Sequence, residues 1–298
     1  MGYMILLGAG ASFGSGSVLP YAPPLGNSLF TKLEELGNTA ASLPNELKDL
    51  FRENFESGMA AYNEFANGNV MSFQRELAGY LARFKPLQGN HYIRLIESLN
   101  NRRFTYCSLN YDLLFELSAN SLGYGITYSN RLAPRNIRLL KIHGSCNFWP
   151  DLGKSIIRGV SFFGSFSAAI SAQVKPLNQY QSILKSTTED SIAPAIAMYA
   201  EGKKVTVCPD YVSAQQEMWN ESINETSKIF IIGVRVHQAD KHIWQNIGES
   251  ESDIYYFGAS KADEEEFVAW KDAYRKKNAY FRLCLFPEAI DAIISLTR

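Results

Sequence analysis

The sequence predicts an α/β protein with a Rossmann-like, doubly wound parallel sheet and an inserted helical subdomain. Short apolar runs, typical of buried strands, alternate with helix-spaced runs over most of the chain, which is the pattern of a parallel sheet covered by helices on both faces. Residues 43–100 instead contain only helical patterns. We therefore expect a single domain over residues 1–298, with a Rossmann core formed by 1–37 and 101–298 and a helical insertion at 38–100.

The first expected elements are a strand and a helix. Tyr3–Leu7 is an apolar run next to glycines, which predicts a buried strand. Apolar residues at helical spacing follow between 29 and 36, and Gly37 suits the end of that helix. In the insertion, three residues suit helix starts: Pro44 in a first turn, and Ser72 and Asn90 as N-caps.

After Arg103 the alternation of strands and helices resumes. Strands are expected at 104–109, 137–142, 204–208, 228–232, 253–257 and 280–286. Helices are expected at 113–122, 212–223, 239–247, 264–276 and 288–296. Residues 150–200 mix aromatic residues, glycines and serines and predict no regular element.

Composition excludes several classes of function. The 298 residues include 29 Lys and Arg against 30 Asp and Glu, so no global positive field exists to attract nucleic acid or an anionic membrane. No run approaches the roughly 18 apolar residues of a membrane span, and the N-terminus lacks a basic signal-peptide start, so we expect a cytoplasmic protein. The four cysteines form no C-x-x-C pair, so we expect no metal and no disulfide framework; they are Cys107, Cys146, Cys208 and Cys284.

A glycine-rich turn follows the first strand: Gly8–Ser12 reads Gly-Ala-Gly-Ala-Ser. Glycines here allow the backbone to approach a phosphate, and the next helix start offers free N–H groups. The dehydrogenase fingerprint would need glycine at Phe13, and its acidic ribose partner is also missing. A tight strand-to-helix turn of any α/β protein is an equally good interpretation.

Polar residues follow two further predicted strands. Asn110 and Asp112 stand where a substrate would bind in an open α/β sheet, although an Asx turn that caps the next helix also explains them. His143 can serve as a general base near neutral pH, although a capping or surface histidine is the commoner case. The other histidines give weaker signals; they are His91, His237 and His242.

Together, these motifs resemble the sirtuin superfamily, and most closely the sirtuin-like NAD hydrolases of bacterial antiphage defence. In order, they are G-A-G-A-S, S-L-N-Y-D, K-I-H-G-S-C-N-F and I-I-G-x-x-x-x-x-x-D-K-H-I, with Pro23-Pro24-Leu25-Gly26 after the first. The resemblance covers about 1–30 and 104–250. It implies a single sirtuin-like catalytic domain that cleaves the nicotinamide–ribose bond of NAD, its substrate, to give nicotinamide and ADP-ribose in antiphage defence.

The resemblance also implies roles for individual residues. Asn110 and Asp112 would border the nicotinamide ribose, and His143 would be the catalytic histidine. The residues implied to bind the rest of NAD are Gly8, Ala9, Gly10 and Ser12 at the diphosphate, and Gly233 and Arg235 on the adenosine side. Arg235 would replace the hydroxyl residue that usually follows this glycine.

Departures from the family keep two alternatives open. One is an NAD-dependent protein deacylase, which the missing four-cysteine zinc ribbon argues against. The other is a non-catalytic module that binds NAD or ADP-ribose, which the retained Asn110 and His143 argue against. The usual glutamine-asparagine pair appears here as Leu109-Asn110, and Gly233 leads into Val234.

The expected chemistry needs few groups. Nicotinamide leaves as a neutral base, so that no general acid is required; Asn110 would position a water or a ribose hydroxyl, and His143 would accept the proton. An unregulated NAD hydrolase would deplete its host, and the elements leave no room for a sensor domain. We therefore expect a nearly silent isolated chain, activated by homo-oligomerisation or by a separately encoded protein. Gly153–Ala172 is the candidate activation loop, with a packed structural excursion as an equal alternative.

Overall fold

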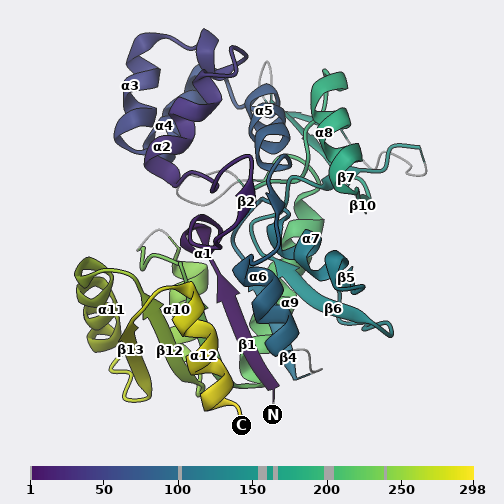
Figure 1. Cartoon of the computed structure of the whole chain (residues 1–298). Coiled ribbons are helices and arrows are strands. Elements are labelled where there is room, and N and C mark those ends of the chain that lie inside the picture. Colours follow the sequence, from purple (N-terminus) through teal and green to yellow (C-terminus); the bar gives the residue numbers. More distant parts are fainter. Residues whose placement is uncertain (1, 100–102, 154–159, 164–166, 198–204, 238–239) are drawn as a thin grey trace.

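A computed structural model describes residues 2–99, 103–153, 160–163, 167–197, 205–237 and 240–298 (Figure 1). Its centre is a seven-stranded, all-parallel sheet with the order β13-β12-β11-β1-β4-β6-β5. The strands are β1 (Gly2–Leu7), β4 (Phe104–Ser108), β5 (Gly125–Thr127), β6 (Asn136–Lys141), β11 (Thr226–Ile232), β12 (Asp253–Gly258) and β13 (Ala279–Leu283). This is the α/β, Rossmann-like doubly wound architecture that the sequence predicts.

The strand order reverses next to β1. From β1 the chain moves outward through β4 to β5 and β6, and later returns to β11 on the other side of β1 before continuing to β12 and β13. In doubly wound sheets, ligands bind at the carboxyl ends of the strands where the order reverses. A ligand site is therefore expected at the boundary between β1 and β11.

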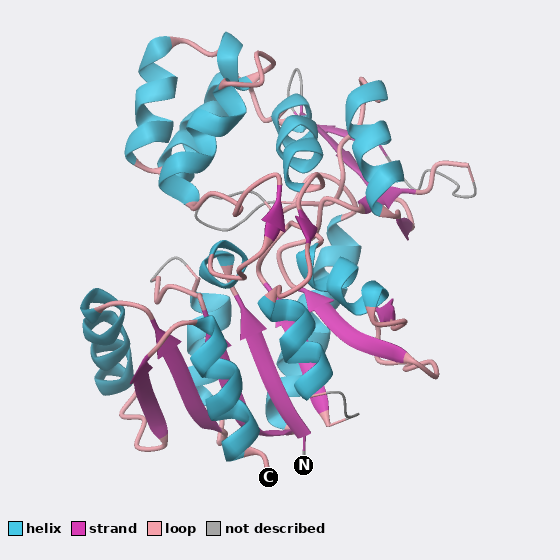
Figure 2. Ribbon diagram, viewed as in Figure 1, coloured by secondary structure: helices cyan, strands magenta, loops and turns pink. Residues whose placement is uncertain are grey.

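Helices cover both faces of the sheet because successive residues of its strands point to opposite faces, and the residues on both faces are apolar. In β1, Ile5 and Leu7 join one buried cluster, whereas Met4 and Leu6 join another. Figure 2 shows α6 and α12 in front of the strands. The first face packs against α6 (His91–Ser98), α7 (Leu114–Ser121) and α12 (Phe286–Leu296), and the second against α9 (Pro209–Asn224), α10 (Lys241–Glu249) and α11 (Lys261–Ala273).

The segment expected to be an insertion is mostly helical. Phe51 lies between the stacked rings of Phe30 and Phe73, with centroid distances of 4.4 and 5.2 Å, so aromatic packing joins its helices. Its N-terminal helices lie beside α2, away from the sheet (Figure 1). Its helices are η1 (Ala40–Ser42), α3 (Asn45–Glu53), α4 (Phe55–Phe65), α5 (Met71–Leu81) and α6, and α2 (Gly26–Glu34) precedes the segment.

Three details of this segment bear on the predictions. Asn90 caps α6 as expected, since its side chain accepts from Tyr92 N at 2.9 Å. Ser72 is not an N-cap; it lies inside α5, whose N-cap is Val70. The segment is also not wholly helical, because β3 (Lys85–Pro86) pairs antiparallel with β2 (Val18–Leu19).

The predicted strand at 204–208 is wrong for the described residues, and residue 204 lies outside them. Val207 forms only an isolated bridge to Ile170, and together with Cys208 it packs in a small cluster around Phe148. The apolar side chains of this run are therefore buried outside the central sheet. The other strands and helices predicted after Arg103 are confirmed, with ends displaced by three residues or fewer. Residue 239, the expected first residue of the helix at 239–247, lies outside the described residues.

Residues 148–188 contain short elements that the sequence did not predict. They are β7 (Phe148–Pro150), β8 (Val160–Phe163), β9 (Ser167–Ile170), β10 (Val174–Pro176) and α8 (Gln179–Thr188). β7 pairs with β10 and β8 with β9, in both cases antiparallel. The candidate activation loop at 153–172 contains β8 and β9, and its residues 154–159 and 164–166 lie outside the described part.

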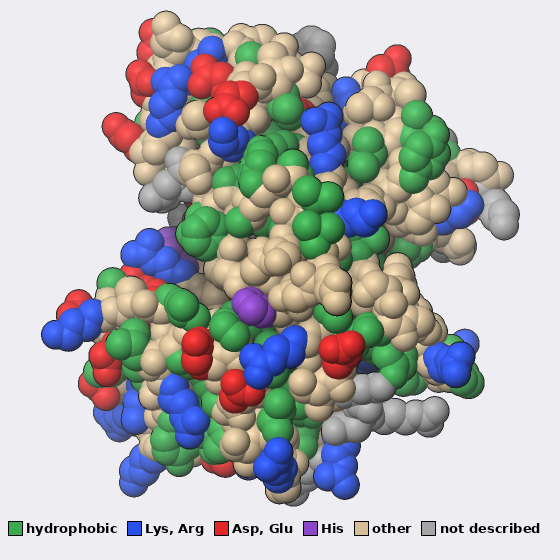
Figure 3. Space-filling view, viewed as in Figure 1, with side chains coloured by type: hydrophobic (Ala, Val, Ile, Leu, Met, Phe, Trp, Pro, Cys, Tyr) green, Lys and Arg blue, Asp and Glu red, His purple; other side chains and the backbone are tan. Residues whose placement is uncertain are grey.

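Charges of both signs are interspersed on the face that Figure 3 shows, which agrees with the near-zero net charge. Within the described residues, no helix combines the length and the apolar character needed to cross a membrane.

Candidate active site

Two glycine turns meet at the point where the strand order reverses. Gly8 N donates to Ile232 O at 3.0 Å, and Gly10 N donates to Gly233 O at 2.9 Å. Gly233 has φ +64°, and a Cβ atom there would lie 2.0 Å from Ala11 N. The backbones after β1 and β11 are therefore in direct contact, and only glycine fits at this position.

The Gly8–Ser12 turn leads into the short helix α1 (Ala9–Phe13). Ala9 is exposed and Gly10 is half-buried, so that the turn presents backbone at the edge of the sheet. The amides of Gly10 and Ala11 already donate to carbonyl oxygens of Gly233 and Gly8. These two amides are therefore engaged within the protein.

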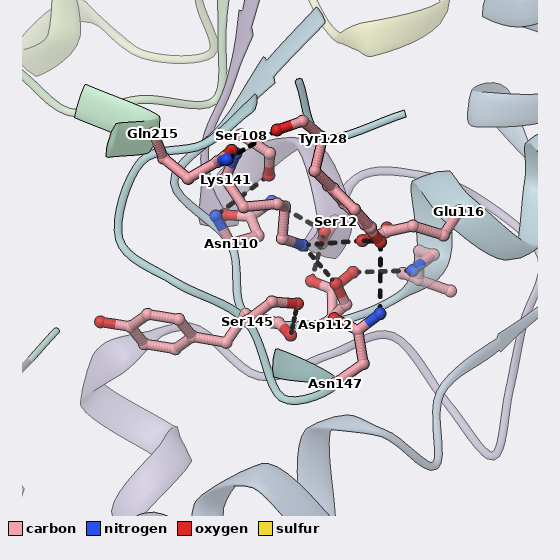
Figure 4. A network of polar contacts seen from close by, with 12 residues as sticks. Ser12, Ser108, Asn110, Asp112, Glu116, Tyr128, Lys141, Ser145, Asn147 and Gln215 are labelled. Carbon is pink, nitrogen blue, oxygen red and sulfur yellow. Dashed lines mark hydrogen bonds and ion pairs between the residues drawn. The ribbon is translucent and has the colours of Figure 1, made fainter. Parts of the chain in front are cut away.

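A buried polar cluster joins this turn to the one that follows β4 (Figure 4). Asn110 Nδ2 donates to Gly8 O at 2.8 Å and to Ser12 Oγ at 2.9 Å, and Ser12 Oγ donates to Asp112 Oδ2 at 2.8 Å. Ser12, Asn110 and Asp112 are 2%, 8% and 6% exposed. Four of the residues expected to contact NAD are thus brought together from two motifs.

Tyr92 completes this cluster, although its sequence context does not single it out. Its hydroxyl lies 3.0 Å from Ser12 Oγ. Because the single proton of Ser12 goes to Asp112, Tyr92 is the donor in this contact. Burial raises the pKa of Tyr92 well above its usual value, and the charge of Asp112 acts in the same direction, so the phenol stays protonated.

Asp112 also shapes the local backbone. Its Oδ1 accepts from Leu114 N at 2.9 Å, which satisfies an amide at the start of α7. The interpretation of Asp112 as an Asx-type capping residue is therefore confirmed. One carboxylate oxygen holds the helix and the other holds Ser12, so the turn is fixed from both sides.

A buried cation lies beneath the Asp112 turn. Lys141, at the end of β6, donates from Nζ to Asp112 O at 2.7 Å and forms an ion pair with Glu116 Oε1 at 3.2 Å. Burial raises the pKa of Glu116, and the charge of Lys141 acts against that shift. Lys141 belongs to a motif noted in the sequence, but only its burial in the structure reveals its role as support for the turn.

His143 follows β6 by two residues and is 2% exposed. Its motif shares a sheet edge with that of Asn110, because Lys141 pairs with Ser108 of the neighbouring β4. The Nε2 atom of His143 lies 3.0 Å from Nε2 of His242, the second residue of α10. This contact joins two motifs whose histidines the sequence could not pair.

The side chain of Arg235 is bound to helix α11. Its guanidinium is bound by Glu266 of α11, with Nε 2.9 Å from Oε1 and 3.1 Å from Oε2, and its side chain is 72% exposed. The pair lies at the surface, where it contributes little to stability. The structure thus joins Gly233 to the glycine turn through its backbone, whereas the Arg235 side chain is held by α11.

A cavity of about 470 Å³ lies beside α7. None of the predicted site residues lines it. Its lining includes Leu113, Glu116, Asn120, Tyr128, Asn147 and Tyr180. The residues of the polar cluster are instead buried where the turns after β1 and β4 are hydrogen-bonded to each other.

Comparisons with known proteins add no family: neither a protein-family model nor a curated protein matches this chain. The geometry itself shows a glycine turn, a buried Ser-Asn-Asp cluster and a buried histidine at neighbouring strand ends. Such an arrangement can hold a nucleotide at the turn, orient a hydroxyl or a water, and accept a proton.

Proposed function

We propose that this chain is an NAD glycohydrolase that cleaves the nicotinamide–ribose bond to give nicotinamide and ADP-ribose. The observation that carries the proposal is the hydrogen-bonded cluster of Ser12, Asn110 and Asp112 beside the reversal of strand order. Nucleotides bind at this position in doubly wound sheets. The resemblance of the four motifs to sirtuin-like NAD hydrolases supplies the substrate, and on the same basis the proposed role is NAD depletion in antiphage defence.

The bound dinucleotide would span the two glycine turns. Its diphosphate would lie against Gly8–Ser12, and its adenosine would lie towards the loop after Gly233. The amide nitrogen of Asn110 is committed to Gly8 and Ser12, which fixes the side chain. Its amide oxygen is then the atom that would meet a ribose hydroxyl or the attacking water.

The reaction needs one base and no acid. Water attacks C1′ of the ribose as the C1′–N bond breaks, and the electron pair of that bond neutralises the pyridinium, so that nicotinamide leaves uncharged. The attacking water gives its proton to His143. The carboxylate of Asp112 would stabilise the positive charge that develops on the ribose, because it is fixed in place before the reaction.

Nicotinamide release by matched variants tests this proposal. Asn110→Ala and His143→Ala should each abolish NAD cleavage while the far-ultraviolet circular dichroism stays unchanged. The controls are Asn45→Ala, at the exposed start of α3, and His237→Ala, at an exposed loop position, and both should retain activity. Cleavage at the wild-type rate by the Asn110 or His143 variant would contradict the proposal. An acyl peptide should not accelerate the reaction; release that depends on the peptide would favour a deacylase.

A further inference from the structure

Three side chains with metal-binding atoms converge where the loop after β6 meets the start of α10. His143 comes from the loop, Asp240 is the N-cap of α10, and His242 is its second residue. One ligand atom from each lies within 4.8 Å of the others. The closest approach is the 3.0 Å contact between the Nε2 atoms of His143 and His242.

That contact has the spacing of two ligands on one ion. Imidazole nitrogens bound to Zn²⁺ at about 2.05 Å lie about 3.3 Å apart at a tetrahedral angle and about 2.9 Å apart at a right angle. The 3.0 Å between the two Nε2 atoms falls between these values. An ion could therefore bind both imidazoles with little movement, and the Asp240 carboxylate would close in by about 1 Å or more to join them.

The ligand types and their burial favour a borderline transition-metal ion. Two imidazoles and one carboxylate suit Zn²⁺ and its first-row neighbours better than Mg²⁺ or Ca²⁺, which prefer oxygen ligands. His143 is almost fully buried, whereas Asp240 and His242 are half-buried. The site thus combines a fixed interior ligand with an accessible side, where water could supply a fourth ligand.

We propose that His143, Asp240 and His242 bind a divalent transition-metal ion, with Zn²⁺ as the representative, and that the bound ion blocks catalysis. The ion takes the Nε2 lone pair of His143, and the proton that the two facing imidazoles share when they hydrogen-bond is released to water. His143 can then no longer accept the proton of a water. Metal binding stands on the geometry alone, whereas inhibition rests on the proposed NAD hydrolysis.

Direct titration of the chelator-treated full chain with Zn²⁺, in competition with a coloured chelator, tests the binding. We expect one tight site per chain in the wild type. His242→Ala and Asp240→Asn should each weaken it by more than the roughly 10- to 100-fold that loss of an outer-sphere partner costs. The control is His237→Ala, which lies between β11 and α10 and is not one of the three ligands. This variant should bind Zn²⁺ as the wild type does. Absence of a tight site, or unchanged affinity in both ligand variants, would overturn the proposal.

The wild-type chain provides a test that needs no folded variant. Co²⁺ bound by two imidazoles, a carboxylate and water should show the strong visible absorption of a low-coordinate site, and Zn²⁺ should displace it. A weak spectrum typical of hydrated Co²⁺ would overturn the metal site.

Adding one equivalent of Zn²⁺ should also stop NAD cleavage, and removing the ion should restore it. If Zn²⁺ binds but the metal-free chain never cleaves NAD, the proposed function fails and the metal site stands.

Discussion

The side-chain amide of Asn110 donates to Ser12 Oγ at 2.9 Å across 98 positions of sequence. Each residue follows the end of a strand, Ser12 after β1 and Asn110 after β4, and these strands are neighbours in the sheet. One hydroxyl thus connects the glycine turn to the Asp112 turn, since it also donates to the Asp112 carboxylate. The hydrogen bonds that join the two turns of the candidate site therefore depend on the Ser12 hydroxyl.

Ser12→Ala should destabilise the protein and reduce NAD cleavage. The change leaves Asp112 Oδ2, Tyr92 and Asn110 each without one buried partner, so we expect a loss of about 1–3 kcal/mol in the free energy of unfolding. Urea denaturation measures this loss. Ser28→Ala, which removes an exposed hydroxyl in α2, is the matched control and should change stability by less than about 0.5 kcal/mol. Equal losses in the two variants would contradict the role of Ser12.

Gly233→Ala should be far more harmful than Gly37→Ala. Both glycines have positive φ, +64° and +75°, so both substitutions introduce backbone strain of about 1–2 kcal/mol. Only at Gly233 does the new Cβ collide with backbone, at 2.0 Å from Ala11 N, whereas nothing lies within 4 Å of it at Gly37. Thermal and urea unfolding should show the Gly233 variant losing at least about 2 kcal/mol more. Similar losses would mean that the two turns are not in contact.

Lys141→Met should cost about 3–5 kcal/mol of stability, because it leaves the Glu116 carboxyl buried without its cation. Adding Glu116→Gln should restore part of this loss, since the remaining partner is then uncharged. A double-mutant cycle by urea denaturation checks the pair. If the second change only adds to the damage, Lys141 and Glu116 are not coupled through charge.

Glu76 should make the protein less stable as pH rises from mildly acidic values. Burial raises its pKa, and the Ala40 amide that it accepts from acts against this shift. The folded state therefore keeps the proton at a pH where the unfolded carboxyl, with a pKa of about 4.3, has lost it. Between the unfolded and the raised folded pKa, stability falls as pH rises.

Glu76→Gln should remove that slope, so that its stability relative to the wild type improves as pH rises from about 4.3 towards the raised pKa of the folded state. Glu64→Gln, an exposed position in α4, is the control and should give a flat difference. Urea denaturation at a series of pH values measures both. A difference for Glu76→Gln that stays constant or declines over this range would show that the carboxyl is not held protonated by the fold.

Much of the central sheet could be predicted because its strands are continuous apolar runs. β1 and β11 are examples: the last four residues of each strand are buried on both faces, and such a short apolar run next to a glycine is typical of a buried strand. β5 was missed because it is a three-residue edge strand. The run at 204–208 misled because apolar residues there fill a small side cluster instead of the sheet. Local pattern reports burial, but it does not say against which layer a residue is buried.

The candidate site could be predicted only in part. Strand-end positions identify Asn110, Asp112 and His143, since polar residues there rarely serve the core. The partners that hold them come from distant segments. Tyr92 from α6 and His242 from α10 become visible only once the fold brings them to Ser12 and His143. Pairing across such distances has no signature in a single sequence.

Product analysis across a series of protein concentrations tests the central claim most directly. The pure wild-type chain and Asn110→Ala are incubated with NAD, and nicotinamide and ADP-ribose are quantified. We expect both products in equal amounts from the wild type, at a rate per chain that is low when dilute and rises as association completes the site, and none from the variant. Equal cleavage by the variant, or loss of NAD without equal amounts of nicotinamide and ADP-ribose, would contradict the account.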